Sequence, residues 1–258
     1  TLRRDAPAAD LPLTIHLDPV NAAALLRWPG QECLLREGQW SDWVRFQFPL
    51  IAPLAQVPGI GRFLLKKTRG DFALYLSPIN LDPAQPAQPI STPPDFSAQL
   101  ARRIGPFYTQ GMPEDTRALS AGVFDDATYR QQAGLVLQEN LRLYEEALSR
   151  TDEGFLFVYH SALDLNSHMF WRTLDPAHPL YTPELAREQG DFIPWLYRQM
   201  DAVVGRALEW ADDRTLLLAV SDHGFGPFRR QFNLNSWLMD NGYAAGGPGF
   251  EREAASYF

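Results

Sequence analysis

Two short clusters of acidic and histidine residues carry the side chains in this sequence that are best suited to binding metal ions. The first cluster is Asp164 and His168, and the second is Asp222 and His223, followed by Gly224. On a helix, residues at i and i+4 lie on the same face, whereas two adjacent residues converge only where the backbone turns, which Gly224 permits. Carboxylate oxygens and imidazole nitrogens are ligands of Zn²⁺ and Mn²⁺. The four residues therefore predict two half-sites that face a common space and hold two metal ions, or one ion with an outer carboxylate.

Each cluster also has a simpler interpretation, as an Asp and a His that form a hydrogen-bonded pair and bind no metal. A single pair of this kind is common by chance. Two such clusters at the ends of two similar apolar runs are a rarer combination, and on the residues alone the metal interpretation and the hydrogen-bonded interpretation stay equally open.

Each cluster follows a short apolar run that is typical of a buried strand. Residues 155–160 precede the first cluster and residues 215–220 precede the second, and both runs are apolar on both faces. Between them, Thr182 with Pro183, and then Asp191, predict the starts of a helical stretch. A unit of strand, helix and strand normally joins parallel strands with right-handed sense. Both clusters are therefore expected at the carboxyl edge of one sheet, where open α/β sheets bind ligands.

The sequence around these motifs resembles the alkaline phosphatase superfamily. The similarity is carried by the runs Phe157 to Arg172, Val220 to Phe228 and Phe232 to Tyr243, and is supported by Gln39 to Val44 and Tyr108 to Thr116. It is strongest with the branch of phosphohydrolases and phosphomutases related to type I phosphodiesterases and nucleotide pyrophosphatases. The resemblance implies an α/β fold with a central, mostly parallel sheet flanked by helices. It also implies a small β-rich insertion or cap region on the N-terminal side.

The resemblance further implies roles for the site residues. Asp164 and His168 match ligands of one divalent ion, and Asp222 and His223 match ligands of another, with Zn²⁺ or Mn²⁺ as the expected metals. The implied activity is hydrolysis of a small phosphate ester through a Thr or Ser nucleophile. Neither that nucleophile nor a further His ligand of the family is found in this sequence, so we expect a piece that lacks both ends of the domain and is inactive alone. No residue is assigned a catalytic or substrate-binding role.

Three alternatives to this activity stay open. A phosphomutase or a sulfatase of the same superfamily shares the metal ligands, and a cysteine at the nucleophile position would indicate the sulfatase. The third alternative is a catalytically silent binding module that keeps the fold without the chemistry.

The composition argues against some classes of protein. The 258 residues include 23 Lys and Arg against 31 Asp and Glu, a formal charge of −8, which argues against a nucleic-acid groove. No run of about 18 apolar residues occurs, so no membrane span is expected. The single cysteine, Cys33, fits a reducing compartment. The cytoplasm is the expected location, with a signal peptide before Thr1 left open. Arg229 and Arg230 lie near enough to the second cluster to meet an anionic substrate or to form solvated surface.

A proline-rich stretch separates two regions whose sequence patterns differ. Residues 1–93 are expected to form the β-rich cap or insertion, in which Glu37-Gly38 turns a strand at 32–36 into a strand at 43–48. Residues 94–258 are expected to form part of the α/β core.

Three further helices are predicted by their terminal residues. One runs from Asp95 to Gly105 and one from Asp125 to about Arg150. The third begins at Asn233 or Asn235, runs through Met239 and stops at Gly242. The middle helix is expected to cover one face of the sheet.

Overall fold

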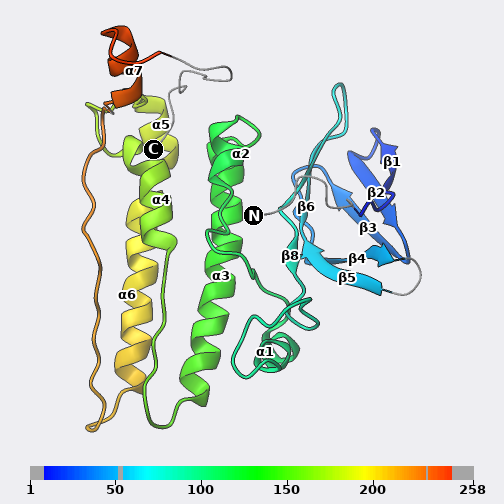
Figure 1. Cartoon of the computed structure of the whole chain (residues 1–258), viewed down its shortest axis with the longest axis horizontal. Helices are drawn as coiled ribbons and strands as arrows, with labels where there is room; N and C mark the ends of the chain where they lie inside the picture. The colour runs from blue at the N-terminus through cyan, green and yellow to red at the C-terminus, as the bar shows by residue number, and fades with distance from the viewer. Residues whose placement is uncertain (1–8, 52–54, 231, 246–258) are drawn as a thin grey trace. The chain divides into compact units, whose positions relative to one another are not determined.

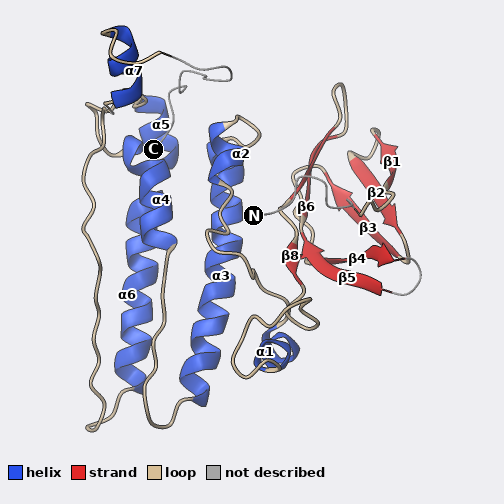
Figure 2. Ribbon diagram, in the orientation of Figure 1, coloured by secondary structure: helices blue, strands red, loops and turns tan. Residues whose placement is uncertain are grey.

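The computed structural model describes residues 9–51, 55–230 and 232–245. The chain forms two compact units, Thr1–Gly111 and Met112–Phe258. Strands lie in the first unit and most helices lie in the second (Figures 1 and 2), so the protein has the mixed α and β composition that the sequence predicts.

The first unit consists of small antiparallel sheets and one helix. One sheet contains β1 (Thr14–Asp18), β2 (Ala23–Trp28) and β3 (Gln31–Arg36); a second contains β4 (Val44–Ile51), β5 (Ala55–Gly61) and β8 (Asn80–Leu81); β6 (Phe63–Lys67) pairs with β7 (Ala73–Leu76). The helix is α1 (Phe96–Ile104), which ends at Gly105 as predicted, with φ 85°. The antiparallel, β-rich character predicted for this region is confirmed.

The predicted hairpin between residues 32–36 and 43–48 is wrong. Strand β3 pairs with β2, through a register in which Trp28 faces Gln31, and β4 pairs with β5. The turn between β2 and β3 is Pro29-Gly30, and Gly30 has φ 75°, as a tight turn with Pro at its second and Gly at its third position requires. Glu37-Gly38 connects two strands that belong to different sheets.

The loop that follows α1 is tied to the strands of the first unit. The side-chain oxygen of Asn80 accepts hydrogen bonds from the backbone amides of Thr109 and Gln110, at 2.8 and 3.0 Å. These bonds explain why the compact unit extends to Gly111. The division into a cap at residues 1–93 and a core at residues 94–258 concerns function and stays a prediction.

The second unit is mainly helical. Its elements are α2 (Thr116–Ser120), α3 (Asp126–Arg150), α4 (Ala162–Phe170), a 3₁₀ helix (Trp171–Thr173), α5 (Pro183–Gln189), α6 (Phe192–Trp210) and α7 (Leu234–Asp240). The predicted caps are confirmed at Asp125, Thr182 and Asn233, whose side chains accept hydrogen bonds from the amides of Thr128, Leu185 and Ser236.

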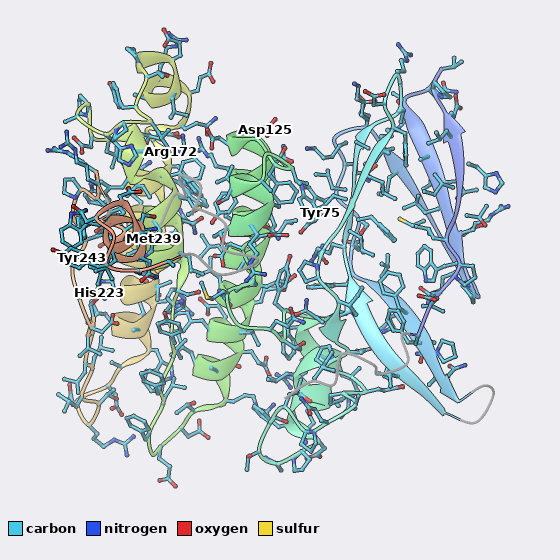
Figure 3. All side chains as sticks on the ribbon, turned by 45° about the horizontal axis from the view of Figure 1, so that its top comes forward. Tyr75, Asp125, Arg172, His223, Met239 and Tyr243 are labelled. Carbon is cyan, nitrogen blue, oxygen red and sulfur yellow. The ribbon has the colours of Figure 1, made fainter. Side chains whose placement is uncertain are left out.

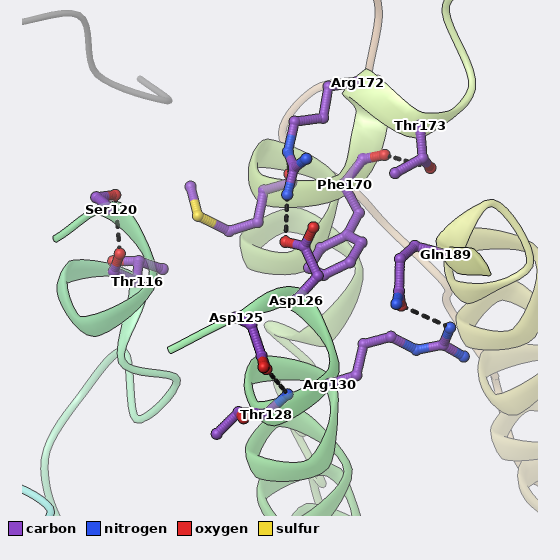
Figure 4. Close-up of polar contacts among 11 residues, drawn as sticks. Thr116, Ser120, Asp125, Asp126, Thr128, Arg130, Phe170, Arg172, Thr173 and Gln189 are labelled. Atoms are coloured by element: carbon purple, nitrogen blue, oxygen red, sulfur yellow. Dashed lines mark hydrogen bonds and ion pairs between the residues drawn. The ribbon is translucent and has the colours of Figure 1, made fainter. Parts of the chain in front are cut away.

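Aromatic and ionic contacts join α3, α4 and α6 at the ends where α3 and α6 begin. Phe170 of α4 stacks on Tyr129 of α3, with ring centroids 5.6 Å apart, and meets Phe192 of α6 edge to face. Arg172, which is buried, forms an ion pair with Asp126 at the start of α3 (Figure 4). Helix α4, which carries the first acidic cluster, is therefore held at its C-terminal end by both neighbouring helices.

The predicted strands at 155–160 and 215–220 are not formed, so the described residues contain no central parallel sheet. Both runs are extended segments that travel in the same direction beside the helices (Figure 1), but no ladder of hydrogen bonds pairs either of them with a strand. An apolar pattern shows which faces of a strand are buried, but it does not specify the neighbouring strand with which the run pairs. Without a hydrogen-bonded neighbour, the run is not part of a sheet.

Only one face of the first run is covered. Leu156 and Val158 pack on the cluster formed by Tyr144 and Leu148 of α3 and Ala207 of α6. The alternate side chains point to solvent, and Phe155 is 90% exposed. The second run is more open still, with Val220 85% exposed. The expectation of runs covered on both sides is therefore wrong within the described residues.

Candidate metal and phosphate site

The first cluster lies on α4, where the helix places both side chains on one face. Asp164 is in the first turn and His168 in the last, and Asp164 Oδ1 lies 3.5 Å from His168 Nε2. The i, i+4 arrangement predicted from the spacing is confirmed. An acidic residue near the helix N-terminus and a histidine near the C-terminus also suit the helix dipole.

The second cluster lies on the irregular segment after residues 215–220, where Figure 3 labels His223. A contact with the backbone orients the ring of this histidine. His223 Nδ1 is 2.8 Å from the carbonyl oxygen of Gly224. A carbonyl can only accept, so Nδ1 carries the proton and the lone pair of the neutral ring is on Nε2. The Gly224 carbonyl, followed by the charge of Asp222, raises the pKa of His223.

The two clusters meet through Asp164 and His223. Asp164 Oδ1 lies 3.6 Å from His223 Nε2, and Asp222 Oδ2 lies 3.8 Å from the same nitrogen. Asp222 itself points outward, with its side chain 90% exposed. All four predicted residues therefore gather in one region, although they come from a helix and from a distant irregular segment.

An aromatic side chain that the sequence did not single out holds the segment in place. Phe225 packs edge to face on His168 and against Trp171, with ring centroids 5.0 Å apart in both cases. It follows the Asp-His-Gly motif directly. The signal available in the sequence was an aromatic residue between two glycines.

A second anchor joins the same segment to the loop after the 3₁₀ helix. Arg229 Nε and Nη2 donate to the two carboxylate oxygens of Asp175, at 2.7 and 3.0 Å. The Arg229 side chain lowers the pKa of Asp175. Of the two arginines that follow the second cluster, Arg229 is therefore engaged with the protein, while Arg230 is exposed. Nothing local in the sequence predicts Asp175 as its partner.

The carboxylate at the centre has an unsatisfied oxygen. Asp164 Oδ1 is out of contact with solvent and has no hydrogen-bond partner, yet two imidazole nitrogens lie near it. A buried anionic oxygen without a partner is costly, and a cation or a proton among these groups would satisfy it. In the described ranges, no group of three or more His, Cys, Asp or Glu side chains is arranged so that it could hold a metal ion. The donor types fit a divalent ion, but the side chains as placed do not form a site for one.

Comparison with protein families places this chain in a known class of phosphoester hydrolases. The model of the type I phosphodiesterase / nucleotide pyrophosphatase family matches residues 77–254. The match covers more than half of the chain and includes both clusters, so the chain belongs to this family. Comparisons with curated proteins and with solved structures give no match.

The family assignment agrees with the resemblance to the alkaline phosphatase superfamily. The matched region begins in the first unit and takes in almost all of the second. In the part of the chain that the structure describes, no helix is both long and apolar enough to cross a membrane.

Proposed function

We propose that the protein is a metal-dependent phosphohydrolase or phosphodiesterase that hydrolyses a small phosphate ester, with Asp164, His168, Asp222 and His223 as ligands of divalent ions. The observation that carries the proposal is the position of Asp164 Oδ1, 3.5 Å from one imidazole Nε2 and 3.6 Å from the other. Membership of a family of phosphodiesterases and pyrophosphatases supports the reaction class.

The spacing of these donor atoms suits a shared ion. Nitrogen and oxygen ligands about 2.0–2.1 Å from a tetrahedral Zn²⁺ are about 3.3 Å from one another. The two measured distances from Asp164 Oδ1 are close to this value, so a small rearrangement of the side chains would place Asp164, His168 and His223 around one ion. Asp222, exposed and farther from the centre, would then bind the second ion of the family or act as an outer carboxylate.

When bound, divalent ions would supply positive charge to the phosphoryl oxygens and lower the pKa of an attacking hydroxyl. The residues of this chain hold the donor atoms in place. The hydrogen bond from His223 Nδ1 to Gly224 fixes the orientation of the ring, and the contact between Arg229 and Asp175 retains the segment that carries it. The nucleophile is proposed to be a Thr or Ser outside these 258 residues, as the family resemblance implies.

The proposal includes the central sheet. Residues 155–160 and 215–220 would be two of its parallel strands, with their uncovered faces and edges available to further strands. Two observations support this: the two runs travel in one direction (Figure 1), and side chains alternate between covered and exposed along the first. In that arrangement both clusters would leave the carboxyl edge of the sheet.

The test measures metal content together with hydrolysis of p-nitrophenyl phosphate and bis(p-nitrophenyl) phosphate by the full-length protein. We expect activity that a chelator removes and that Zn²⁺ or Mn²⁺ restores. Asp222→Ala should lose activity, whereas Asp213→Ala, at an exposed aspartate of the preceding turn, should retain it. Activity that survives both chelation and Asp222→Ala would end the proposal.

A further inference from the structure

The segment of residues 216–230, which carries the second cluster, has few attachments to the rest of the second unit. All of its residues are described, and every one except Phe225 is exposed. Among the described residues, no backbone group of this segment hydrogen bonds to the backbone of another element. Apart from His223, the side chains that join it to other elements by ring contacts or ion pairs are Phe225 and Arg229. The position of His223 therefore depends on very few contacts.

Phe225 packs against two rings that lie one helical turn apart. Its ring centroid is 5.0 Å from that of His168, with the planes at 83°, and 5.0 Å from that of Trp171, with the planes at 41°. Residues three positions apart on a helix are neighbours on its surface, and edge-to-face packing is a favoured arrangement of aromatic rings. The residues on either side, Gly224 and Gly226, have no side chains to pack. Phe225 therefore makes the apolar contact of this part of the segment by itself.

The surface that receives Phe225 is fixed to the helices of the second unit. Trp171 lies between two buried residues of the chain. Phe170 has no exposed surface and packs on rings of α3 and α6, and Arg172 is paired with Asp126 at the start of α3 (Figure 4). Trp171 cannot move without disturbing these contacts, so the ring of Phe225 packs on a rigid surface.

The contact of Phe225 acts on candidate ligands from both clusters. Phe225 is two positions from His223, and two residues of chain span at most about 7 Å, so His223 stays near α4 while Phe225 is packed there. His223 Nε2 and His168 Nε2 lie 3.6 and 3.5 Å from the same oxygen, Asp164 Oδ1. The ring of Phe225 also packs on the His168 imidazole itself and restricts its rotation. One aromatic contact thus orients one candidate ligand and limits the movement of another.

We propose that Phe225 is a positioning residue that joins the two acidic-histidine clusters into one metal site. Its ring packs on His168 and Trp171, and by this contact it holds His223 near Asp164. The inference rests on the proposed function, since the position of these side chains matters only if they bind metal. Removal of the ring leaves every donor atom in the chain but releases the segment that brings the clusters together.

The experiment measures the Zn²⁺ affinity of the full-length wild-type protein and its variants by isothermal titration calorimetry, compared at equal folded fraction. We expect Phe225→Ala to weaken Zn²⁺ binding by about 10–100-fold, the range seen when a residue that orients metal ligands is lost. Phe225→Tyr keeps the ring and should bind Zn²⁺ as the wild-type protein does. Phe228→Ala removes a ring of the same segment that is 52% exposed, and as the matched control it should leave the affinity unchanged. Excess Zn²⁺ should restore the kcat of Phe225→Ala, because the proposed ligands are all present.

A double-mutant cycle separates a positioning role from a general effect on stability. If Phe225 acts through His223, then His223→Ala should cost less Zn²⁺ affinity in Phe225→Ala than in the wild-type protein. A general loss of stability would leave the cost of His223→Ala the same in both proteins.

The outcomes separate the two proposals. A wild-type protein that binds no Zn²⁺ overturns the proposed function and this inference with it. Zn²⁺ binding that Asp164→Ala abolishes while Phe225→Ala leaves it unchanged overturns the inference alone. An equal loss in Phe228→Ala, or an additive result in the cycle of Phe225 and His223, does the same.

Discussion

Asp164 Oδ1 and His223 Nε2 lie 3.6 Å apart, although one residue is on a helix and the other on a distant irregular segment. Because Gly224 holds the proton of His223 on Nδ1, the lone pair of the neutral ring and the carboxylate oxygen approach each other without a proton between them. Two electron-rich atoms in this arrangement repel unless a cation or an additional proton joins them. A divalent ion or a second proton on His223, whose pKa is raised, would satisfy this pair of atoms.

The first prediction follows for Asp164. Asp164→Asn removes the negative charge while keeping the shape, so we expect Zn²⁺ affinity to fall by at least about 100-fold, more than the loss expected for an outer partner. Isothermal titration calorimetry with Zn²⁺ measures the change. Asp213→Asn, at an exposed turn, is the matched control. Equal affinity of Asp164→Asn and the wild-type protein would exclude Asp164 as a ligand.

A second prediction concerns acid stability and the pair formed by Asp175 and Arg229. Arg229 lowers the pKa of Asp175, so the folded state binds the proton less readily than the unfolded state. The stabilisation is present above the ordinary pKa of about 4 and is lost as pH falls through the lowered value. Arg229→Gln should therefore reduce the steepness of the acid limb of unfolding, measured by circular dichroism. Arg230→Gln, at an exposed neighbour, should leave it unchanged; an identical acid limb in Arg229→Gln would contradict the prediction.

A third prediction concerns the buried ion pair between Arg172 and Asp126. Arg172→Met leaves the carboxylate at the start of α3 without its partner, and we expect a loss of about 2–3 kcal/mol in the free energy of unfolding. Urea denaturation measures this loss. Asp126→Asn with Arg172→Met should cost less than the sum of the single changes. Arg206→Met, which breaks a half-exposed pair with Glu145, should cost less than Arg172→Met; the reverse order would disprove the assigned importance of the buried pair.

The helices could be predicted from the sequence because their start and stop signals are local. Asp125 and Thr182 bind the first amides of their own helices, and the Asp164 to His168 spacing fixes a shared face for any helix that contains them. These features depend on residues a few positions apart.

The pairing of strands could not be predicted in the same way. The strand 32–36 has two neighbours in the chain, and the hydrophobic pattern alone does not say which becomes its partner; Pro29-Gly30 decided it. For residues 155–160 the alternation of side chains locates the face against α3 and α6, but sheet partners lie elsewhere in the fold. Asp175 acts through a contact with Arg229, which is distant in the sequence, so Asp175 does not stand out there.

The last prediction uses the titration of Glu114. Its pKa in the folded protein is about 7, above the usual value of about 4.3, so the neutral form stabilises the fold at low pH and this advantage is lost as pH rises through about 7. Relative to Glu114→Gln, which does not titrate, the wild-type protein should lose about 2 kcal/mol of unfolding free energy between roughly pH 5.5 and 8. Urea denaturation of both proteins across this range measures the difference. Glu153→Gln, at an exposed position, controls for the loss of a charge. A constant difference between the wild-type protein and Glu114→Gln would show that Glu114, which is buried in the structure, titrates as an exposed carboxyl.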